Sequence, residues 1–364
     1  MKRYGIITHY GVHNHGALLQ LTALVRVLAR DYGIKAKALR FEKNYDFLGH
    51  ALKAKYEQPG LSALKIYLGY LKEKGIRQFV YNVKKRRTLQ AFKGNELIGD
   101  FYSESEQLDG VVVGSDEVFA LHTGPTPVFF GHCLPSDNVF AYAGSFGPTT
   151  MDDIRRLHSE PFVKSGLMAM KGVSVRDDNS REVVRALTGE VVPKLIDPVL
   201  LYGFENEIAQ LKSPAEKNYL LVYAYDNRMN SSEEVAAIMA YAKSRGLKTL
   251  SPGFYHSWCD VNVNTDPINL LAYFKNATEV ITDTFHGSIM SAITGARFVT
   301  KTREENRFKL TSLLAELGLA ERIISDFDEI GSKMDKDIDY DNMNQLLRAR
   351  RAEAHEYLKK MTEA

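Results

Sequence analysis

The residues in this sequence that are best suited to chemistry surround His286. A short apolar stretch, residues 279–282, precedes it, and small or apolar residues recur behind it at helical spacing, at Ile289, Ala292, Ile293 and Ala296. A strand that turns and continues as a helix leaves unpaired backbone N–H groups at the helix start, where anions bind. The spacing leaves two interpretations open: His286 faces a ligand, or Asp283 or Thr284 caps the helix and His286 lies on the surface.

Polar and charged residues also follow the other predicted strands directly. Because the carboxyl ends of parallel strands meet at one edge of a sheet, these residues should line a common cleft. The candidates are Asn14, His15, Ser115, Asp116, Ser145, Arg176, Asp177, His286, Arg307 and Lys309. Arginine and lysine beside a histidine at a helix start indicate a phosphate or carboxylate ligand, and Asp116 and His286 have side chains that transfer protons.

Structural interpretations compete with functional ones at three of these positions. Asp116 has a side chain that commonly caps a helix. Arg176 could form an ion pair with Asp177 or Asp197 rather than bind a ligand. His286 could hold a phosphate through its charge alone, without transferring a proton.

Two series of strands and helices would position this cleft. The first series opens with a strand at residues 4–8, a loop at 11–17, a helix that Gly33 ends and a strand at 35–41. That order is the opening unit of a doubly wound α/β domain. Further strands are expected at residues 109–113, 139–143, 173–175, 219–223, 248–250, 279–282 and 298–299. The sequence therefore predicts an α/β protein with two doubly wound, Rossmann-like domains that face a cleft.

We place the domains at residues 1–205 and 206–335, followed by a charged helix over residues 336–364 that packs back across both. Residues 45–100 interrupt the first domain as a helical insertion, in which Leu61, Leu64, Leu68 and Leu71 recur at helical spacing. Its basic run, residues 84–87, has two interpretations. It is a solvated helix face, or it is a surface that contacts anionic lipid headgroups or a phosphate-bearing acceptor.

Composition excludes several classes of protein. The 364 residues are 45% apolar and 25% charged, as in an ordinary globular chain, and the net charge of +2 does not indicate nucleic-acid binding. The two cysteines lack metal-ligand spacing, and no apolar stretch approaches the roughly 18 residues of a membrane span. The apolar run after the first residues is too short for a signal peptide, so we expect a cytoplasmic protein. From the cysteine spacing we expect no metal site.

Nucleotide and hydrolase motifs are also missing from the sequence. It contains no nucleophile elbow and no Walker loop, and residues 11–16 lack the three-glycine pattern of a dinucleotide site. The residues alone therefore predict a transferase-like protein of two domains with an anionic ligand in the cleft.

Six separated motifs, in order, resemble those of the polysaccharide pyruvyl transferases. They are Asn-x-Gly-Ala with a following Leu-Gln at 14–20, Gly-Ser-Asp-x-Val at 114–118, Tyr-Ala-x-Ser-Phe-Gly at 142–147, Val-Arg-Asp at 175–177, Asp-Pro-x-Leu-Leu at 197–201 and Thr-Asp-x-Phe-His-Gly at 282–287. Lys309 matches the family's basic residue before a closing Leu-Gly-Leu. The resemblance extends over nearly the whole chain, from about residue 5 to about residue 320.

The resemblance implies a fold of the glycosyltransferase-B type and phosphoenolpyruvate as donor, with no further cofactor. Pyruvate would bridge two hydroxyls of a sugar or lipid-linked oligosaccharide as a ketal, and phosphate would be released. Donor-binding roles carry over to Arg176, His286, Lys309, Ser115 and Gly287. Asp116 would act near the reacting carbon or the attacking hydroxyl, and His286 is the candidate general acid.

The remaining candidates are assigned to acceptor binding or to the shape of the loops: Asn14, His15, Ser145, Glu117 and Arg307. Two departures from the family pattern affect them. Glu117 and Phe119 replace the more usual Gln and Trp, and the loop at residues 11–16 is rich in histidine.

The residues are also compatible with two other functions. One is a nucleotide-sugar glycosyltransferase of the same fold, and the other is a non-catalytic protein of glycan assembly.

Overall fold

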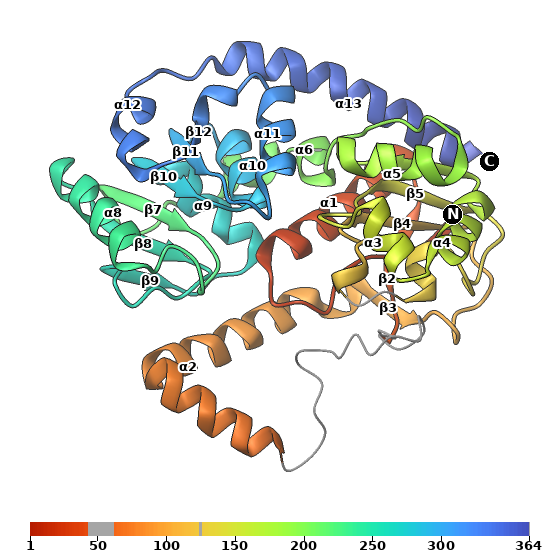
Figure 1. The fold of residues 1–364 in the computed structure, drawn as a ribbon, viewed down its shortest axis with the longest axis horizontal. Helices are drawn as coiled ribbons and strands as arrows, with labels where there is room; N and C mark the ends of the chain where they lie inside the picture. The colour runs from red at the N-terminus through yellow and green to blue at the C-terminus, as the bar shows by residue number, and fades with distance from the viewer. Residues whose placement is uncertain (43–61, 124–125, 364) are drawn as a thin grey trace.

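The computed structural model describes residues 1–42, 62–123 and 126–363, and contains two parallel six-stranded sheets with helices around each (Figure 1). The prediction of an α/β protein with two doubly wound domains is confirmed. Leu61 and most of the loop before it lie outside the described residues.

The N-terminal sheet has the order β3-β2-β1-β4-β5-β6. Its strands are β1 (Arg3–Ile7), β2 (Lys35–Arg40), β3 (Ile98–Phe101), β4 (Gly110–Asp116), β5 (Val139–Gly144) and β6 (Gly172–Val175). The central strand β1 pairs on both sides, so that Ile6 lies opposite Ala38 and Val112. The chain order reverses between β1 and β4, and such a switch point opens a crevice at the carboxyl ends of the strands.

The C-terminal sheet repeats this plan in the order β12-β11-β10-β7-β8-β9. Its strands are β7 (Tyr219–Tyr223), β8 (Lys248–Pro252), β9 (Val261–Val263), β10 (Glu279–Thr282), β11 (Phe298–Lys301) and β12 (Ile323–Ile324). The switch point lies between β7 and β10, where Val280 pairs with Leu221. The sequence analysis did not predict β3, β9 and β12, which are short strands at the edges of the two sheets.

Helices connect these strands and cover both sheets. They are α1 (His15–Tyr32), α2 (Ser62–Leu97), α3 (Met151–Arg156), α4 (Glu160–Ala169), α5 (Asp178–Thr188), α6 (Pro198–Tyr202), α7 (Glu205–Gln210), α8 (Ser232–Ser244), α9 (Pro267–Asn276), α10 (Phe285–Thr294), α11 (Arg307–Glu316), α12 (Ile330–Met334) and α13 (Tyr340–Glu363). The helix α1 shows why the boundaries fall where they do. The Asn14 side chain accepts a hydrogen bond from Gly16 N at its start, and Gly33 ends it in the left-handed region with φ 63°.

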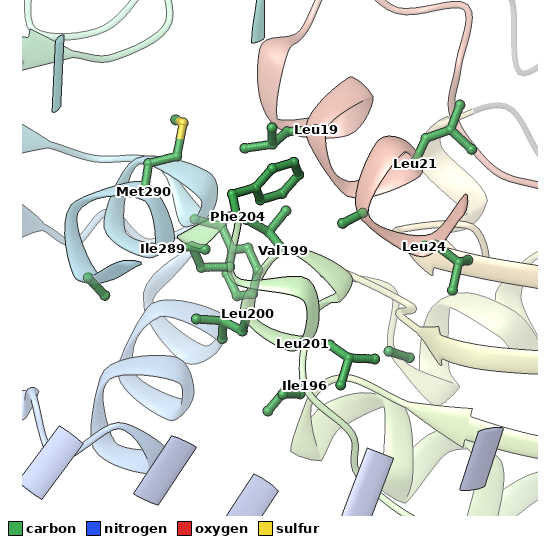
Figure 2. Close-up of a cluster of buried hydrophobic side chains, with 14 of the residues drawn as sticks. Leu19, Leu21, Leu24, Ile196, Val199, Leu200, Leu201, Phe204, Ile289 and Met290 are labelled. Atoms are coloured by element: carbon green, nitrogen blue, oxygen red, sulfur yellow. The ribbon is translucent and has the colours of Figure 1, made fainter. Parts of the chain in front are cut away.

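One hydrophobic cluster extends across both halves, and further clusters lie within each half. Figure 2 shows α6 between α1 and α10, with Leu19, Val199 and Ile289 directed into the same cluster. The helix α13 spans both halves (Figure 1): the Tyr340 hydroxyl donates to Ala296 O at 2.6 Å, and the Tyr357 hydroxyl donates to Ala141 O at 2.8 Å. The helices α6 and α13 therefore hold the two halves together beside the cleft.

The insertion forms the long helix α2, which bends at Gly75 and Gly94 and extends toward the C-terminal sheet (Figure 1). The Tyr81 hydroxyl of α2 donates a hydrogen bond of 2.7 Å to Val263 O of β9. The insertion thus belongs to the first half by sequence and contacts the second half by structure.

Candidate active site between the two sheets

A cavity of about 390 Å³ lies between the carboxyl ends of the two sheets. Both switch points contribute to its wall, because β4 ends at Asp116 and the β10–α10 turn contains Thr284, Phe285 and His286. Its polar and charged lining residues are His9, Asn14, Asp116, Glu117, His122, Tyr223, Tyr225, Arg228, Asp283, Thr284, His286, Glu305, Asn306 and Lys309, with Arg176. Part of the predicted set therefore meets at one cavity: Asn14, Asp116, Arg176, His286 and Lys309.

Asp116 ends β4 in a conformation with positive φ, 82°, so its carboxylate leaves the strand direction and faces the cavity. Burial favours the neutral acid, but the nearby Arg176, His9 and His286 outweigh burial and lower the pKa of Asp116 to about 2. Asp116 is a strand end and not a helix cap, so that competing interpretation is wrong. The carboxylate is ionised at neutral pH.

Arg176 follows β6 and is 8% exposed. Its Nη1 donates to Asp197 Oδ2 at 3.0 Å, its Nη2 lies 3.6 Å from Asp116 Oδ1, and its guanidinium lies 4.4 Å from the centre of the Phe285 ring. Burial opposes the charge, but the acids around Arg176 raise its pKa. Arg176 therefore both forms the expected ion pair with Asp197 and lines the cavity.

His286 is the second residue of α10. Thr284 caps this helix by accepting a hydrogen bond of 2.9 Å from Gly287 N, as one sequence interpretation expected. The same interpretation also placed His286 on the surface. That part is wrong, because His286 is 9% exposed and faces the cavity. Its Nε2 lies 3.5 Å from Asp197 Oδ2, and a Cβ atom at Gly16 would overlap its ring.

Asp197 connects the two halves of the site. It is fully buried, it contacts Arg176 of the N-terminal half and His286 of the C-terminal half, and it caps α6 through Val199 N at 2.9 Å. Burial raises its pKa, but His286 and then Arg176 outweigh that effect and lower it. The buried carboxylate therefore fixes the positions of the arginine and the histidine relative to each other.

Lys309 approaches from α11 and donates a hydrogen bond of 2.6 Å to Glu117 Oε1. Arg228, which follows β7, lies 4.0 Å from Asp283 Oδ2, and Arg303 already holds that carboxylate at 2.5 Å. Of the two guanidinium groups that line the cavity among the described residues, Arg228 has weaker ion pairing than Arg176. Lys309 is paired directly with Glu117. Both Arg228 and Lys309 add positive charge to the wall that contains the start of α10.

The structure places the other predicted residues around the cavity in different ways. Asn14 lines the cavity, and its amide donates to the Tyr225 hydroxyl at 3.2 Å. Ser115 is buried and donates to Ala143 O at 2.9 Å, while Ser145 donates to Asp177 at 2.6 Å and accepts from Gly147 N. These serine contacts shape the loops beneath the site.

His15, Gly287 and Arg307 also do not line this cavity. His15 is fully buried, contacts Thr265 O at 2.9 Å, and has its pKa lowered to about 3 by burial. Gly287 lies behind the cap of α10, and Arg307 is exposed, with its guanidinium 5.5 Å from the Phe308 ring centre. His15 joins the two halves of the molecule by packing.

The sequence analysis did not name several of the cavity residues, among them Arg228, Tyr225, His9 and Asn306. Arg228 and Tyr225 follow β7 and His9 follows β1, so the strand-end rule that found Asp116 could have found them. Asn306 gives no such signal. It acts through the fold, because its amide donates to Asp283 O at 2.7 Å.

The basic run at residues 84–87 is not a uniform solvated face. Lys84, Arg86 and Arg87 are exposed, but Lys85 is 6% exposed and its Nζ lies 3.8 Å from the centre of the Phe254 ring. Burial lowers the pKa of Lys85 to about 8, although Asp226 partly opposes this. None of the helices in the described parts of the chain is both long and apolar enough to cross a membrane.

Similarity to solved structures supports the fold. S. aureus MnaA, in its co-structure with UDP, is similar at a TM-score of 0.52 and 11% identity, over 94% of this chain and 90% of that one. UDP-N-acetylglucosamine 2-epimerase from Rickettsia bellii gives 0.51 and 11%, over 100% and 97%. The spinosyn rhamnosyltransferase SpnG gives 0.48 and 11%, over 100% of both chains. At this identity, the first two structures show only that the fold is shared. That fold is of the glycosyltransferase-B type.

Sequence comparison gives the family. No curated protein matches the sequence. The family model described as polysaccharide pyruvyl transferase matches residues 14–304, which include Asp116, Arg176 and His286. The chain therefore belongs to the polysaccharide pyruvyl transferase family.

Proposed function

We propose that the protein transfers the pyruvyl group of phosphoenolpyruvate to two hydroxyls of a glycan sugar, forming a ketal and releasing phosphate. One observation carries the proposal: Arg176, His286 and Lys309, from three separate segments, converge on one cavity together with the ionised Asp116. Phosphoenolpyruvate carries a phosphate and a carboxylate, and this set of cations matches both groups.

The first chemical step is protonation of C3 of the donor, which converts the CH₂ group to CH₃ and leaves positive charge at C2. His286 is the candidate acid, because it faces the cavity and Asp197 orients its ring from 3.5 Å. Asp116 is ionised and so is suited to stabilise the charge at C2. A sugar hydroxyl then attacks C2.

In the second step, a neighbouring hydroxyl attacks the same carbon, the C–O bond to phosphate breaks and the ring closes. The protons of the two hydroxyls end on C3 and on the released phosphate, so the reaction balances without a further co-reactant. Arg228 and Lys309 would stabilise the departing phosphate as its negative charge grows. No metal or organic cofactor is part of this proposal.

Calorimetric titration with phosphoenolpyruvate tests the proposal most directly. Wild-type protein should bind it saturably, and Arg176→Ala should abolish the binding. Because this variant removes the arginine partner of Asp116 and Asp197, Arg176→Lys serves as the second variant, with folding checked by circular dichroism. Stabilisation of the wild type by nucleotide sugars, with no response to phosphoenolpyruvate, would instead favour a glycosyltransferase.

A further inference from the structure

A second cavity, of about 870 Å³, lies between α2 and the C-terminal sheet, outside the proposed reaction site. Gln78 of α2 forms one wall, and Asn230, Ala236, Tyr255 and Trp258 belong to the other walls. We call this cavity the α2–α8 groove. Its chemistry differs from that of the active-site cavity.

Two aromatic rings line the α2–α8 groove and are held in fixed orientations. The Tyr255 ring packs 5.5 Å from the Tyr81 ring of α2, and Trp258 Nε1 donates to Asn230 Oδ1 at 3.0 Å. Both rings remain partly exposed. Fixed, partly exposed aromatic rings offer apolar faces on which the C–H face of a pyranose packs and loses its contact with water.

The polar groups of the groove are those that recognise sugar hydroxyls. They are the amide of Gln78, the carboxylate of Asp226, to which Gln78 Nε2 donates at 3.4 Å, and the hydroxyls of Ser232 and Ser257. The Asn230 amide is occupied within the protein, by Trp258 and by Asp226 O. Among the described residues that line the groove, Asp226 is the only one with a charged side chain, and none is a lysine or arginine. The groove therefore suits an uncharged ligand, whereas the active-site cavity suits an anion.

One chain segment separates the groove from the active-site cavity. Tyr225 and Arg228 line the active-site cavity, while Asp226 and Asn230 line the groove, all in the turn between β7 and α8. The Cα atoms of neighbouring residues such as Tyr225 and Asp226 are about 3.8 Å apart. The active-site cavity and the groove therefore border the same turn, and a glycan chain that occupies both would cross it.

We propose that the α2–α8 groove binds the uncharged sugars that adjoin the pyruvylated sugar of the acceptor. The link to the acceptor rests on the proposed function. The consequence is a preference for an oligosaccharide over a single sugar, since only a chain of sugars occupies the cavity and the groove together.

The test uses Trp258, which is the only tryptophan of the sequence and therefore the source of its tryptophan fluorescence. The protein is titrated, without phosphoenolpyruvate, with chitotetraose, mannotetraose, cellotetraose and β-1,4-galactotetraose, and with the four matching monosaccharides. We expect a saturable change in emission with at least one tetrasaccharide, at least 10-fold weaker with its monosaccharide. No response to any tetrasaccharide, or an equal response to the monosaccharide, overturns the proposal.

Two matched variants locate the binding. Ala236 lines the groove and Ala240 does not, and both are exposed on α8, where arginine is well tolerated in a helix. Ala236→Arg should weaken the tetrasaccharide response by at least 10-fold, and Ala240→Arg should preserve it. Equal responses from the two variants would place the binding elsewhere.

The groove and the donor site can fail independently. Phosphoenolpyruvate calorimetry on Ala236→Arg should match the wild type. If the wild type responds to a tetrasaccharide but does not bind phosphoenolpyruvate, the proposed donor is wrong and the groove proposal stands. If the wild type binds phosphoenolpyruvate but responds to no tetrasaccharide, the groove proposal is wrong and the proposed donor stands.

Discussion

Lys309 and Glu117 form an ion pair of 2.6 Å across the cleft, at the wall of the active-site cavity. Burial favours the neutral form of Glu117, but Lys309 outweighs burial and lowers its pKa, so the carboxylate is charged. An anionic donor that binds Lys309 therefore competes with this internal partner.

The first prediction follows from this competition. Glu117→Gln should tighten phosphoenolpyruvate binding by about 5- to 10-fold, because removing one neighbouring negative charge is worth on the order of 1 kcal/mol. Calorimetry measures the change. Glu305→Gln is the matched control, since it removes a charge from the cavity wall without releasing Lys309, and it should change the affinity far less. Weaker binding by Glu117→Gln would mean that the carboxylate assists the donor.

The second prediction concerns His286. His286→Ala should reduce turnover by about 10²- to 10⁴-fold, as loss of a positioned acid does. His286→Gln then separates the two roles: an acid is not replaced by an amide, whereas a hydrogen-bonding phosphate ligand partly is. Phosphate release, measured with saturating acceptor, gives the rate, and near-normal turnover of the alanine variant would exclude catalysis by this residue.

The third prediction concerns stability in acid. Asp116 has its pKa lowered from the usual 3.8 to about 2 in the folded protein, so its ionised form stabilises the fold above about pH 4. This contribution, about 2 kcal/mol, should be lost as the pH falls from about 5 to 2. Urea unfolding at several pH values should show a shallower dependence for Asp116→Asn. An unchanged slope would indicate that Asp116 is not held ionised.

The fourth prediction tests membrane contact by the basic run. The exposed Lys84, Arg86 and Arg87 should bind vesicles that contain phosphatidylserine at low salt, with about 1 kcal/mol from each cation, and high salt should release the protein. The triple change to glutamine should abolish co-sedimentation. Lys85 is left unchanged because it is buried against Phe254.

A matched control for the vesicle experiment removes three exposed cations elsewhere. Arg155, Arg156 and Lys164 lie in α3 and α4, and their change to glutamine alters the net charge equally. If this variant loses binding to the same extent, attraction is a property of total charge. If wild-type protein does not sediment at low salt, the basic run is simply a solvated face.

Much of the fold could be predicted because its signals are local. The apolar run that forms β4, the left-handed Gly33 that ends α1 and the Thr284 cap of α10 each depend on a few adjacent residues. The edge strands β9 and β12 could not be predicted, because they have three and two residues and are defined by their partners β8 and β11.

The site was predictable to the extent that it follows strand ends. Asp116 and Arg176 face the cavity because β4 and β6 end there, and His286 because α10 begins there. Contacts between halves have no such rule. Lys85 is buried against Phe254 only when distant segments pack. The same holds for Asp197, which becomes the shared partner of Arg176 and His286.

The helix α13 ties distant parts of the chain together, and this has a consequence for folding kinetics. Tyr357 contacts Ala141 and Arg351 donates to Leu200 O, pairs separated by 216 and 151 residues. Contacts of such separation form slowly, because a long loop must close before they contribute. Both sheets are synthesised before α13, so part of their apolar surface stays uncovered until it docks. A nascent chain that stops short of α13 should therefore be a substrate for chaperones and proteases.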